Sequence, residues 1–295
     1  MSGKVILGLN NRIDACALSS TATWAATLPL ANIKTPVLGR VARTTGAAAF
    51  TITADFGGLA ARNIGVVAIA GHNLSRLAAV QVQTYQGVTL VDDSAALSPW
   101  PYLASDDPHF QSHAFSAAIV DDERIAGMMP TLVYFLPSNS VADKVVITIT
   151  DTGNAAGYVE IGRVFIGQQW LPALNVEYGD ASYALLDFSA IQTTQRHVKF
   201  FDRMRPIRTA TAALKDLTEG EAFGGLYAAQ RSAGLTGEVV WAADKPTYLA
   251  IGGVKAVDSN WFAKAFLGNF TALDALSQPY LASRSGSINI EEVAI

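Results

Sequence analysis

Two histidines in a proline-rich segment have the spacing of a metal site. His109 and His113 are four residues apart, and on a helix this spacing places both imidazoles on one face, as a zinc site requires. Asp106 or Asp107 would supply a third ligand. The segment lacks the glutamate of the helical zinc-protease motif. We therefore interpret it as a polar loop, and a metal-dependent hydrolase is one alternative function.

The other two histidines and the single cysteine favour structural roles. His72 precedes Asn73 at the end of a predicted strand, where a side chain that supports the turn is expected. His197 lies in a predicted strand, and we expect a half-buried or interface side chain there. Cys16 has no cysteine to pair with, and its residue type favours a buried position.

Two groups of carboxylates are close enough in sequence to act together. Asp92 and Asp93 form one group, and residues 121–123 (Asp-Asp-Glu) form the other. A carboxylate pair could hydrolyse a glycosidic bond, or bind Ca²⁺ in a loop; acids exposed at turns are the simpler interpretation. The chain has neither a Gly-x-Ser-x-Gly nucleophile motif nor a phosphate-binding glycine motif. We therefore predict no enzyme, no cofactor and no metal.

Three aromatic residues fall in a long loop expected over residues 92–113. They are Trp100, Tyr102 and Phe110, and three prolines accompany them. Exposed aromatic rings stack on sugars or anchor partner proteins. The alternative is that the rings pin the loop to its own domain. These residues are the candidate contacts for a partner or a glycan.

A basic cluster occurs in the second half of the chain. It consists of Arg196, Lys199, Arg203, Arg205 and Arg208. Such a cluster could bind an anion or nucleic acid. The spacing does not place all five on one face of a strand, which favours an interface in a ring, against acidic residues of a neighbouring subunit. A solvated patch is the alternative.

Composition limits the classes of function. Of the 295 residues, 50% are apolar and 16% are charged, and 21 Lys+Arg against 25 Asp+Glu give a net charge of −4. This composition excludes a disordered chain and argues against a nucleic-acid binder. The charged share is below the usual value of about 25%, so much of the surface is neutral or apolar, as in subunits that bury surface against other chains. No apolar run is long enough for a signal peptide or a spanning helix, so we expect a soluble chain with no membrane insertion.

The elements that carry these residues are predicted to be strands. Alternating polarity over residues 50–55 and 79–85 indicates half-buried strands, and the apolar run 63–70 indicates a strand buried on both faces. Further strands are predicted over 131–136, 144–150 and 157–167. The turn-rich connections favour an antiparallel sandwich over an alternating α/β fold.

A domain boundary is predicted near residue 178. Beyond it, residues 183–214 are predicted to form two long strands around 202–206. One helix follows at about 219–232, where Thr218 and Glu221 form a capping box and Gly234 can end the helix. The last predicted strands are 238–242, 248–251, 261–270 and 287–293. The predicted fold class is mainly β, with domains 1–178 and 179–295.

The first domain resembles the galactose-binding-like jelly rolls, which include discoidin-type domains and many carbohydrate-binding modules. The resemblance lies in residues 50–57 (Phe-Thr-Ile-Thr-Ala-Asp-Phe-Gly) and 63–75, with 144–150 and 158–166 as closing strands. It implies a jelly-roll β-sandwich. No ligand residue is carried over from that family.

Nearly the whole chain resembles minor tail proteins of long-tailed bacteriophages (siphoviruses). In the first domain this rests on residues 32–36, 38–43 and 162–170. The second domain, with long strands, one helix and a terminal strand at 288–292, is similar to the tail-tube-like β-barrel of distal tail proteins. The resemblance implies a virion protein, assembled in the host cytoplasm, that forms a ring at the tail tip.

This resemblance also implies the partners and the function. The partners would be other copies of the chain, the tail tube, the tape-measure protein and the tail-tip hub, with host-surface glycans as a further candidate. No nucleic-acid sequence would be recognised. The predicted function is structural: the ring links the tail tube to the tip and to the host-adhesion proteins. The alternatives are a carbohydrate-binding protein for host-surface glycans and a hydrolase.

Overall fold

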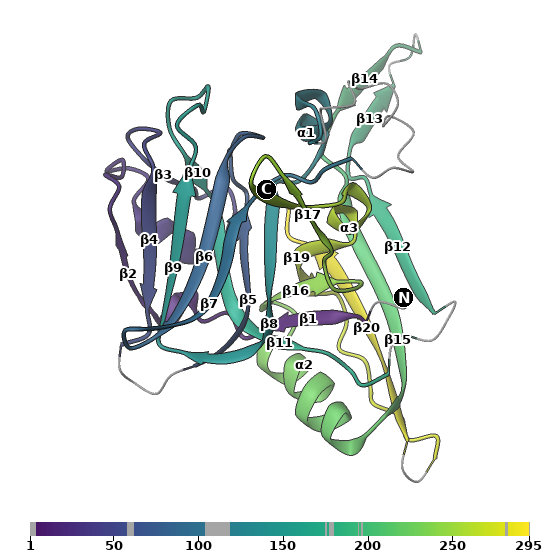
Figure 1. Cartoon of the computed structure of the whole chain (residues 1–295). Coiled ribbons are helices and arrows are strands. Elements are labelled where there is room, and N and C mark those ends of the chain that lie inside the picture. Colours follow the sequence, from purple (N-terminus) through teal and green to yellow (C-terminus); the bar gives the residue numbers. More distant parts are fainter. Residues whose placement is uncertain are drawn as a thin grey trace. The chain divides into compact units, whose positions relative to one another are not determined.

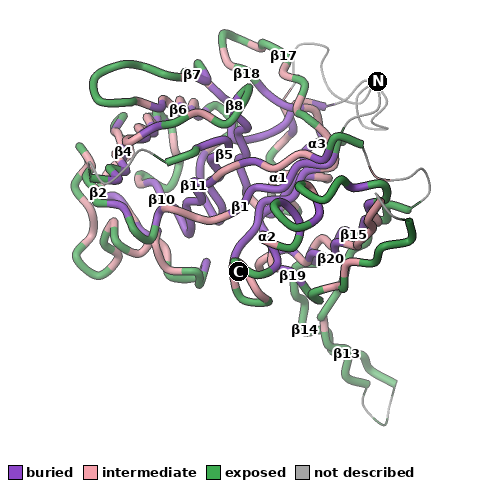
Figure 2. The backbone as a smooth tube through the Cα atoms, turned by 90° about the horizontal axis from the view of Figure 1, so that it is seen from below, coloured by how far each residue is buried: buried purple, intermediate pink, exposed green. Residues whose placement is uncertain are grey.

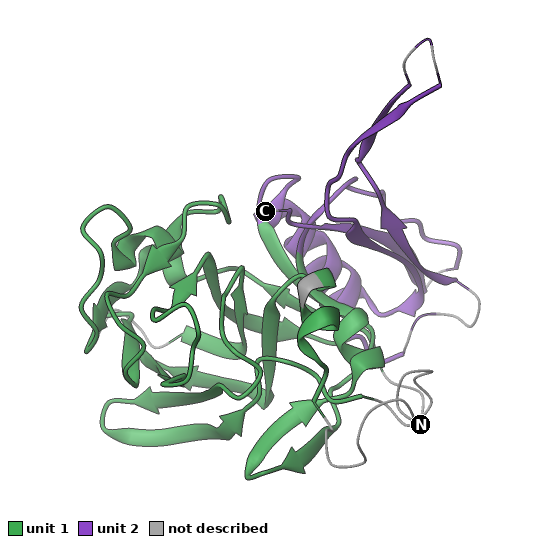
Figure 3. Ribbon diagram, turned by 90° about the horizontal axis from the view of Figure 1, so that it is seen from above, with its two compact units in different colours: residues 1–171, 238–267, 295 green, residues 172–237, 268–294 purple. Residues whose placement is uncertain are grey.

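A computed structural model describes residues 4–57, 62–103, 119–174, 176, 180–193, 195, 197–280 and 283–294. The chain divides into two compact units (Figure 3): unit 1 holds residues 1–171 and 238–267, and unit 2 holds 172–237 and 268–294. The predicted domains 1–178 and 179–295 differ from these units. Residues 238–242 return to unit 1 because they pair with a strand near the N-terminus.

Unit 1 is a β-sandwich of two largely antiparallel sheets (Figure 1). Within this unit, the first sheet has the order β16 (Glu238–Ala242), β1 (Ile6–Leu9), β11 (Arg163–Trp170), β5 (Arg62–Ala70) and β8 (Thr131–Ala142). The second has the order β17 (Tyr248–Ile251), β18 (Val254–Val257), β7 (Thr89–Leu97), β6 (Ala79–Gln86), β9 (Lys144–Thr150), β4 (Phe50–Asp55) and β2 (Ala17–Ser20). The pairing of β18 with β7 is parallel.

Short elements complete unit 1. They are η1 (Ile13–Ala15), η2 (Leu30–Lys34), the paired strands β3 (Ala42–Arg43) and β10 (Glu160–Ile161), and the helices α1 (Asp122–Gly127) and α3 (Ser259–Ala263). Two predictions from the sequence about this unit are wrong. The loop predicted to begin at residue 92 begins only after β7, and the strand predicted over 261–270 is α3 followed by β19 (Ala265–Phe270). Asp258 explains α3, because its carboxylate caps the helix by accepting from the Trp261 N–H at 2.6 Å.

The predicted alternation places apolar side chains between the two sheets of unit 1. In β4, Phe50, Ile52 and Ala54 are buried while the intervening threonines are half-exposed. Ile147 of β9 lies opposite Ile52 and is buried in the same core. Every residue of β5 from Ile64 onward is buried, which confirms a strand covered on both faces. The mainly β fold class is likewise confirmed.

Gly65 allows a bulge in β5. The pairing of β5 with β8 shifts register between Ile64 and Val66. A Cβ on Gly65 would lie 2.1 Å from Oδ1 of Asn139. The Asn139 side chain needs that space because it binds the backbone of Gln169 from both its oxygen and its nitrogen. The bulge therefore depends on glycine at this position.

Unit 2 contains an antiparallel sheet, a hairpin and a helix. Its sheet is formed by β12 (Ala181–Leu186), β15 (Ile207–Leu217), β20 (Arg284–Glu292) and the C-terminal half of β19. The hairpin is β13 (Ala190–Thr193) with β14 (Lys199–Asp202). The two long strands predicted over 183–214 are thus four strands, because the chain leaves the sheet after β12 and rejoins it at β15.

The predicted helix is present, with both of its ends. It consists of the π-helical segment η4 (Gly220–Tyr227) and α2 (Ala228–Ala233). The Thr218 N–H donates to Oε2 of Glu221 at 3.0 Å, and the Glu221 N–H donates to the Thr218 hydroxyl, which confirms the capping box. Gly234 follows with a φ of 57°. No helix in the described part of the chain has the length and apolarity needed to cross a membrane.

Candidate functional site

Of the three aromatic residues predicted for an exposed loop, Trp100 is buried. Trp100 is 3% exposed, its Nε1 donates to the Leu74 carbonyl at 2.7 Å, and its ring lies edge-on to that of His72. Trp100 is therefore a core residue of unit 1, and its ring is closed to a sugar or a partner. Tyr102 is half-buried. Phe110 lies outside the described residues.

The two described histidines, His72 and His197, show no catalytic arrangement. The Leu74 N–H donates to Nδ1 of His72 at 3.3 Å, which confirms the structural role in the turn. Burial lowers the pKa of His72 to about 3, so this imidazole is neutral at physiological pH. His197 is exposed with a φ of 58°, in the connection between β13 and β14, so the predicted strand position is wrong. His109 and His113, the candidate metal ligands, lie outside the described residues.

The carboxylates in the described residues serve local structure. Asp92 accepts from the Tyr134 hydroxyl at 2.8 Å, and Asp93 accepts from the side-chain amides of two glutamines on β6. Asp121 caps α1 by accepting from the Arg124 N–H at 2.9 Å. Within the described ranges, no group of three or more His, Cys, Asp or Glu side chains is placed to hold a metal ion.

The predicted basic cluster separates into two environments. Arg208 is largely buried and forms an ion pair with Glu292, so it belongs to the interior of unit 2 and not to a subunit interface. Arg196 lies outside the described residues. The three remaining members are exposed on β14 or directly after it: Lys199, Arg203 and Arg205. Among the described members of the cluster, these three are the ones placed to meet another molecule.

Unit 1 contains a polar groove of about 640 Å³. It is bordered by residues 73–77, 150–155 and helix α1. Asp151 fixes the two loops, because it is buried and accepts from the Ser75 N–H at 2.9 Å and from the Asn154 amide at 2.8 Å. At the border, Arg76 faces Asp122 at 3.8 Å. The described lining includes no aromatic ring, so sugars would meet hydrogen-bonding groups without a stacking platform.

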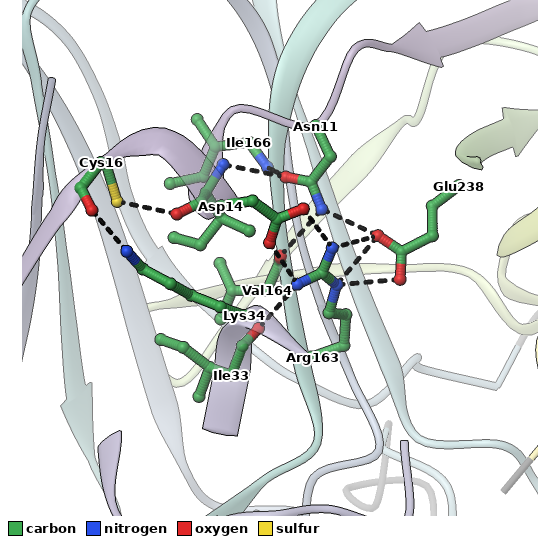
Figure 4. A network of polar contacts seen from close by, with 10 residues as sticks. Asn11, Asp14, Cys16, Ile33, Lys34, Arg163, Val164, Ile166 and Glu238 are labelled. Atoms are coloured by element: carbon green, nitrogen blue, oxygen red, sulfur yellow. Dashed lines mark hydrogen bonds and ion pairs between the residues drawn. The ribbon is translucent and has the colours of Figure 1, made fainter. Parts of the chain in front are cut away.

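A buried charge network lies between β11 and β16 (Figure 4). Arg163, 2% exposed, binds Glu238 (Nη2 to Oε2, 2.7 Å) and Asp14 (Nη1 to Oδ1, 2.7 Å), and it donates to the Ile33 carbonyl. The Asn11 amide donates to Glu238 at 2.9 Å. Burial lowers the pKa of Arg163, but the hydrogen bonds and charges of Asp14 and Glu238 outweigh burial and raise it. The guanidinium therefore stays charged and holds the first residue of β16 in unit 1.

The hairpin of unit 2 exposes apolar side chains on both of its faces. All residues of β13 and β14 are exposed, as Figure 2 shows in green. Ile191 pairs with Phe201, and Gln192 pairs with Phe200. Because successive side chains of a strand point to opposite faces, the two phenyl rings lie on opposite faces of the hairpin. A two-stranded hairpin has no core of its own to cover them.

Exposed apolar side chains are concentrated in unit 2 as a whole. Among the described residues, fifteen of the twenty-two exposed large apolar side chains belong to unit 2, which holds less than a third of the chain. The exposed aromatic residues of the described ranges are all in this unit: Tyr183, Phe188, Phe200, Phe201, Phe223, Tyr227 and Tyr280. Apolar patches of this kind mark surfaces that other molecules cover. We take the exposed surface of unit 2 as the candidate functional site.

Sequence reasoning identified the charges of this site but missed its apolar component. The adjacent pair Phe200 and Phe201 was a usable signal, because two neighbouring strand residues cannot both face one core. The Arg163 network gave no local signal. Its partners lie 75 and 149 residues away along the chain.

Comparisons with known proteins find partial structural likeness. A lectin domain of lectinolysin, complexed with Lewis B antigen, is 13% identical over 54% of this chain and 96% of that chain, with a TM-score of 0.36. The family 32 carbohydrate-binding module of C. perfringens NanJ, complexed with galactose, is 12% identical over 56% and 99%, with a TM-score of 0.36. A Streptococcus pneumoniae fucose-binding module is 12% identical over 54% and 96%, with a TM-score of 0.35. No protein-family model and no curated protein matches the sequence.

Proposed function

We propose that the protein is a structural subunit that assembles with copies of itself into a ring, as its resemblance to distal tail proteins of siphoviruses implies. The observation that carries this proposal is the concentration of exposed aromatic and aliphatic side chains in unit 2. Apolar surface in water is unfavourable by about 25 cal/mol per Å². Association of subunits removes that surface from water, whereas a chain acting alone would leave it exposed.

The residue types of this surface also support an interface. Protein interfaces are enriched in aromatic residues, methionine and arginine and depleted in lysine and acidic residues. Residues 200–204 have the sequence Phe-Phe-Asp-Arg-Met, and four of these five belong to the enriched types. The low overall charge of 16% acts in the same direction.

On this proposal the two units have different tasks. Unit 2 joins neighbouring copies, and the well-packed sandwich of unit 1 is a separate domain carried by each copy. The tail tube, the tape-measure protein and the tip hub would contact the ring within the virion. The role is connective and includes no bond-making or bond-breaking step.

The oligomeric state of the full chain tests the proposal. We expect light scattering to give a mass several times that of one chain, and negative-stain images to show closed particles with a central opening. The double variant Phe200→Ser/Phe201→Ser should reduce this mass, while the matched variant Leu77→Ser, which changes an exposed residue of unit 1, should not. A wild-type chain that remains monomeric over the accessible concentration range contradicts the proposal.

Carbohydrate binding is the second candidate, and the polar groove of unit 1 is the observation in its favour. Arg76, Asp122 and Asn154 line this groove and could form hydrogen bonds with sugar hydroxyls. A panel of immobilised cell-surface glycans should retain the full chain and release it when Arg76→Ala and Asn154→Ala are introduced together. Equal retention of wild type and variant, or no retention of either, excludes the groove as a glycan site.

A further inference from the structure

We propose that the hairpin of one copy docks onto the helix of unit 2 in the next copy. The hairpin surface consists of Lys199 and Phe201 on one face of β14, Phe200 on the opposite face, and Arg203 and Arg205 directly after the strand. The helix strip consists of Glu219, Phe223 and Tyr227, together with Asp216 near the end of β15. This inference rests on the proposed self-assembly and specifies which two surfaces meet.

The hairpin surface needs a cover from outside its own chain. Phe200 is 59% exposed and Phe201 is 56% exposed. Figure 3 shows the hairpin extending away from the remaining strands of unit 2. A hairpin of this kind is marginally stable alone, so burial of the face that carries Phe201 against a neighbour would order the hairpin and contribute free energy to the interface.

The helix strip, the second surface of the proposed contact, is also exposed and lies in the same unit as the hairpin. Glu219, Phe223 and Tyr227 follow one another at intervals of four residues, which places them along one side of the helix. Phe223 and Tyr227 are each about half-exposed, and their ring centroids are 6.0 Å apart. No atom lies within 4 Å of a Cβ built on Gly220 or Gly224, so the side of the helix beside these rings is open.

Charges distinguish the two surfaces. Residues 196–205 contain four basic residues and one aspartate, whereas the rest of unit 2 contains nine acidic and four basic residues. On the helix strip, the Glu219 side chain is 76% exposed. Its cation, Arg284, lies 3.5 Å away, is only 13% exposed, and also lies 5.7 Å from the centroid of the Phe223 ring, so Glu219 is the more exposed charge of the pair. Asp216, also exposed, accepts from Ser283.

These features favour a second copy as the occupant of the helix strip. The hairpin surface offers aromatic rings with positive charge, and the helix strip offers aromatic rings with negative charge, so one chain carries both halves of a complementary pair. Opposite charges suppress wrong registers and speed encounter. Because the two surfaces differ, the contact is heterologous, and repetition of such a contact closes into a ring when the rotation permits.

Cross-linking between two variants, each with one added cysteine, tests the contact directly. The native Cys16 is buried and does not compete. Full chains with Phe201→Cys and Tyr227→Cys are mixed, oxidised and separated on a non-reducing gel. We expect a disulfide-linked pair of chains in this mixture. The matched control mixes Phe201→Cys with Leu77→Cys, whose side chain is 81% exposed in unit 1, and should give no more than background.

A charge exchange gives an independent test. Lys199→Glu/Arg203→Glu makes the hairpin surface acidic, and Asp216→Asn/Glu219→Lys makes the helix strip basic. Asparagine is chosen at position 216 because its φ of 54° suits Asn. Each variant alone should associate about tenfold more weakly than wild type, a change of about 1.4 kcal/mol. An equimolar mixture of the two should regain assembly, because each hairpin surface again meets an opposite charge.

The outcomes separate this inference from the proposed function. Selective cross-linking and recovery in the mixture support the docking of hairpin on helix. A wild-type chain that assembles but gives no selective cross-link overturns the inference and leaves self-assembly standing. A wild-type chain that stays monomeric overturns both. Circular dichroism of each variant shows whether a loss of association reflects a loss of fold.

Discussion

The two units treat their aromatic residues in opposite ways. In unit 1, Trp100 and Trp261 are buried and hydrogen-bonded through their indole nitrogens. In unit 2, Phe200 and Phe201 face solvent on both sides of a hairpin. Unit 1 covers its rings within one chain. Unit 2 buries Phe270 but leaves seven described rings exposed, and this difference supports the intermolecular role proposed for unit 2.

The difference arises from sheet architecture. Unit 1 has two sheets, so each strand finds an inner face to bury its apolar residues. The hairpin of unit 2 has two strands and no facing sheet. Its apolar residues therefore have no facing sheet in unit 2, among the described residues, against which to pack. The chain therefore combines a self-sufficient domain with one whose surface is incomplete in the monomer.

Removal of one aromatic ring from each unit tests this contrast most strongly. Trp100→Ala should lower the free energy of unfolding by about 4 kcal/mol, because it leaves a cavity and an unpaired Leu74 carbonyl. Phe200→Ala should change it by less than about 0.5 kcal/mol in dilute solution, because the ring is exposed. Denaturant titration of both full-length variants measures the two values. Similar losses would contradict the assignment of buried and exposed rings.

Variants of the Arg163 network should show that losing one partner of a buried ion pair costs more stability than losing both. Arg163→Met leaves Glu238 buried without its cation and should cost about 3–5 kcal/mol. Arg163→Met/Glu238→Leu removes both buried charges and should recover most of that loss. Thermal or chemical unfolding of the full chain compares the three proteins. A double variant that is less stable than the single variant would show that the network stabilises unit 1 beyond simple charge compensation.

Acid should destabilise unit 1 partly through His72. Its folded pKa of about 3 lies below the ordinary value of 6.5, so between these values the unfolded chain binds a proton that the folded chain excludes. The stability that His72 contributes is complete above pH 6.5 and falls by about 1.4 kcal/mol per pH unit as pH drops toward 3.

The matched variant is His72→Asn, whose amide oxygen can accept the Leu74 N–H in place of Nδ1. Its unfolding free energy should depend less steeply on pH in this range than that of wild type. Denaturant titrations at several pH values give both slopes, and parallel curves would exclude His72 as the source.

The smallest expected effect concerns the helix of unit 2. Thr218→Ala removes the hydroxyl that accepts the Glu221 N–H, and should cost about 1 kcal/mol. Thr218→Ser keeps the hydroxyl and serves as the control. Hydrogen exchange of the amides of the first helical turn should be faster in Thr218→Ala alone. Unchanged exchange would mean that packing of Ala222 and Leu226, both fully buried, maintains the helix start without the cap.

Local patterns were sufficient for much of the fold. The alternation over 50–55, the buried run 63–70 and the capping box at Thr218 each concern neighbours in sequence, and each is present in the structure. The segment 261–270 shows the limit. Its apolar residues fit a strand equally well, and only the Asp258 cap distinguishes the helix that begins there. The five basic residues of 196–208 were predicted to form one candidate interface. The sequence gives no sign that one of them, Arg208, pairs with Glu292 inside unit 2.

The sequence by itself determined the mainly β class, most strand positions, the ends of the helix and the basic character of residues 196–205. These features follow from periodicity, capping and charge, which act over a few residues. The tertiary structure alone decided that Trp100 and Arg208 are internal, that Glu238 returns to unit 1 through Arg163, and that the rings of the hairpin stay uncovered. Burial and ion pairing join residues far apart in the chain, so no local pattern contains them.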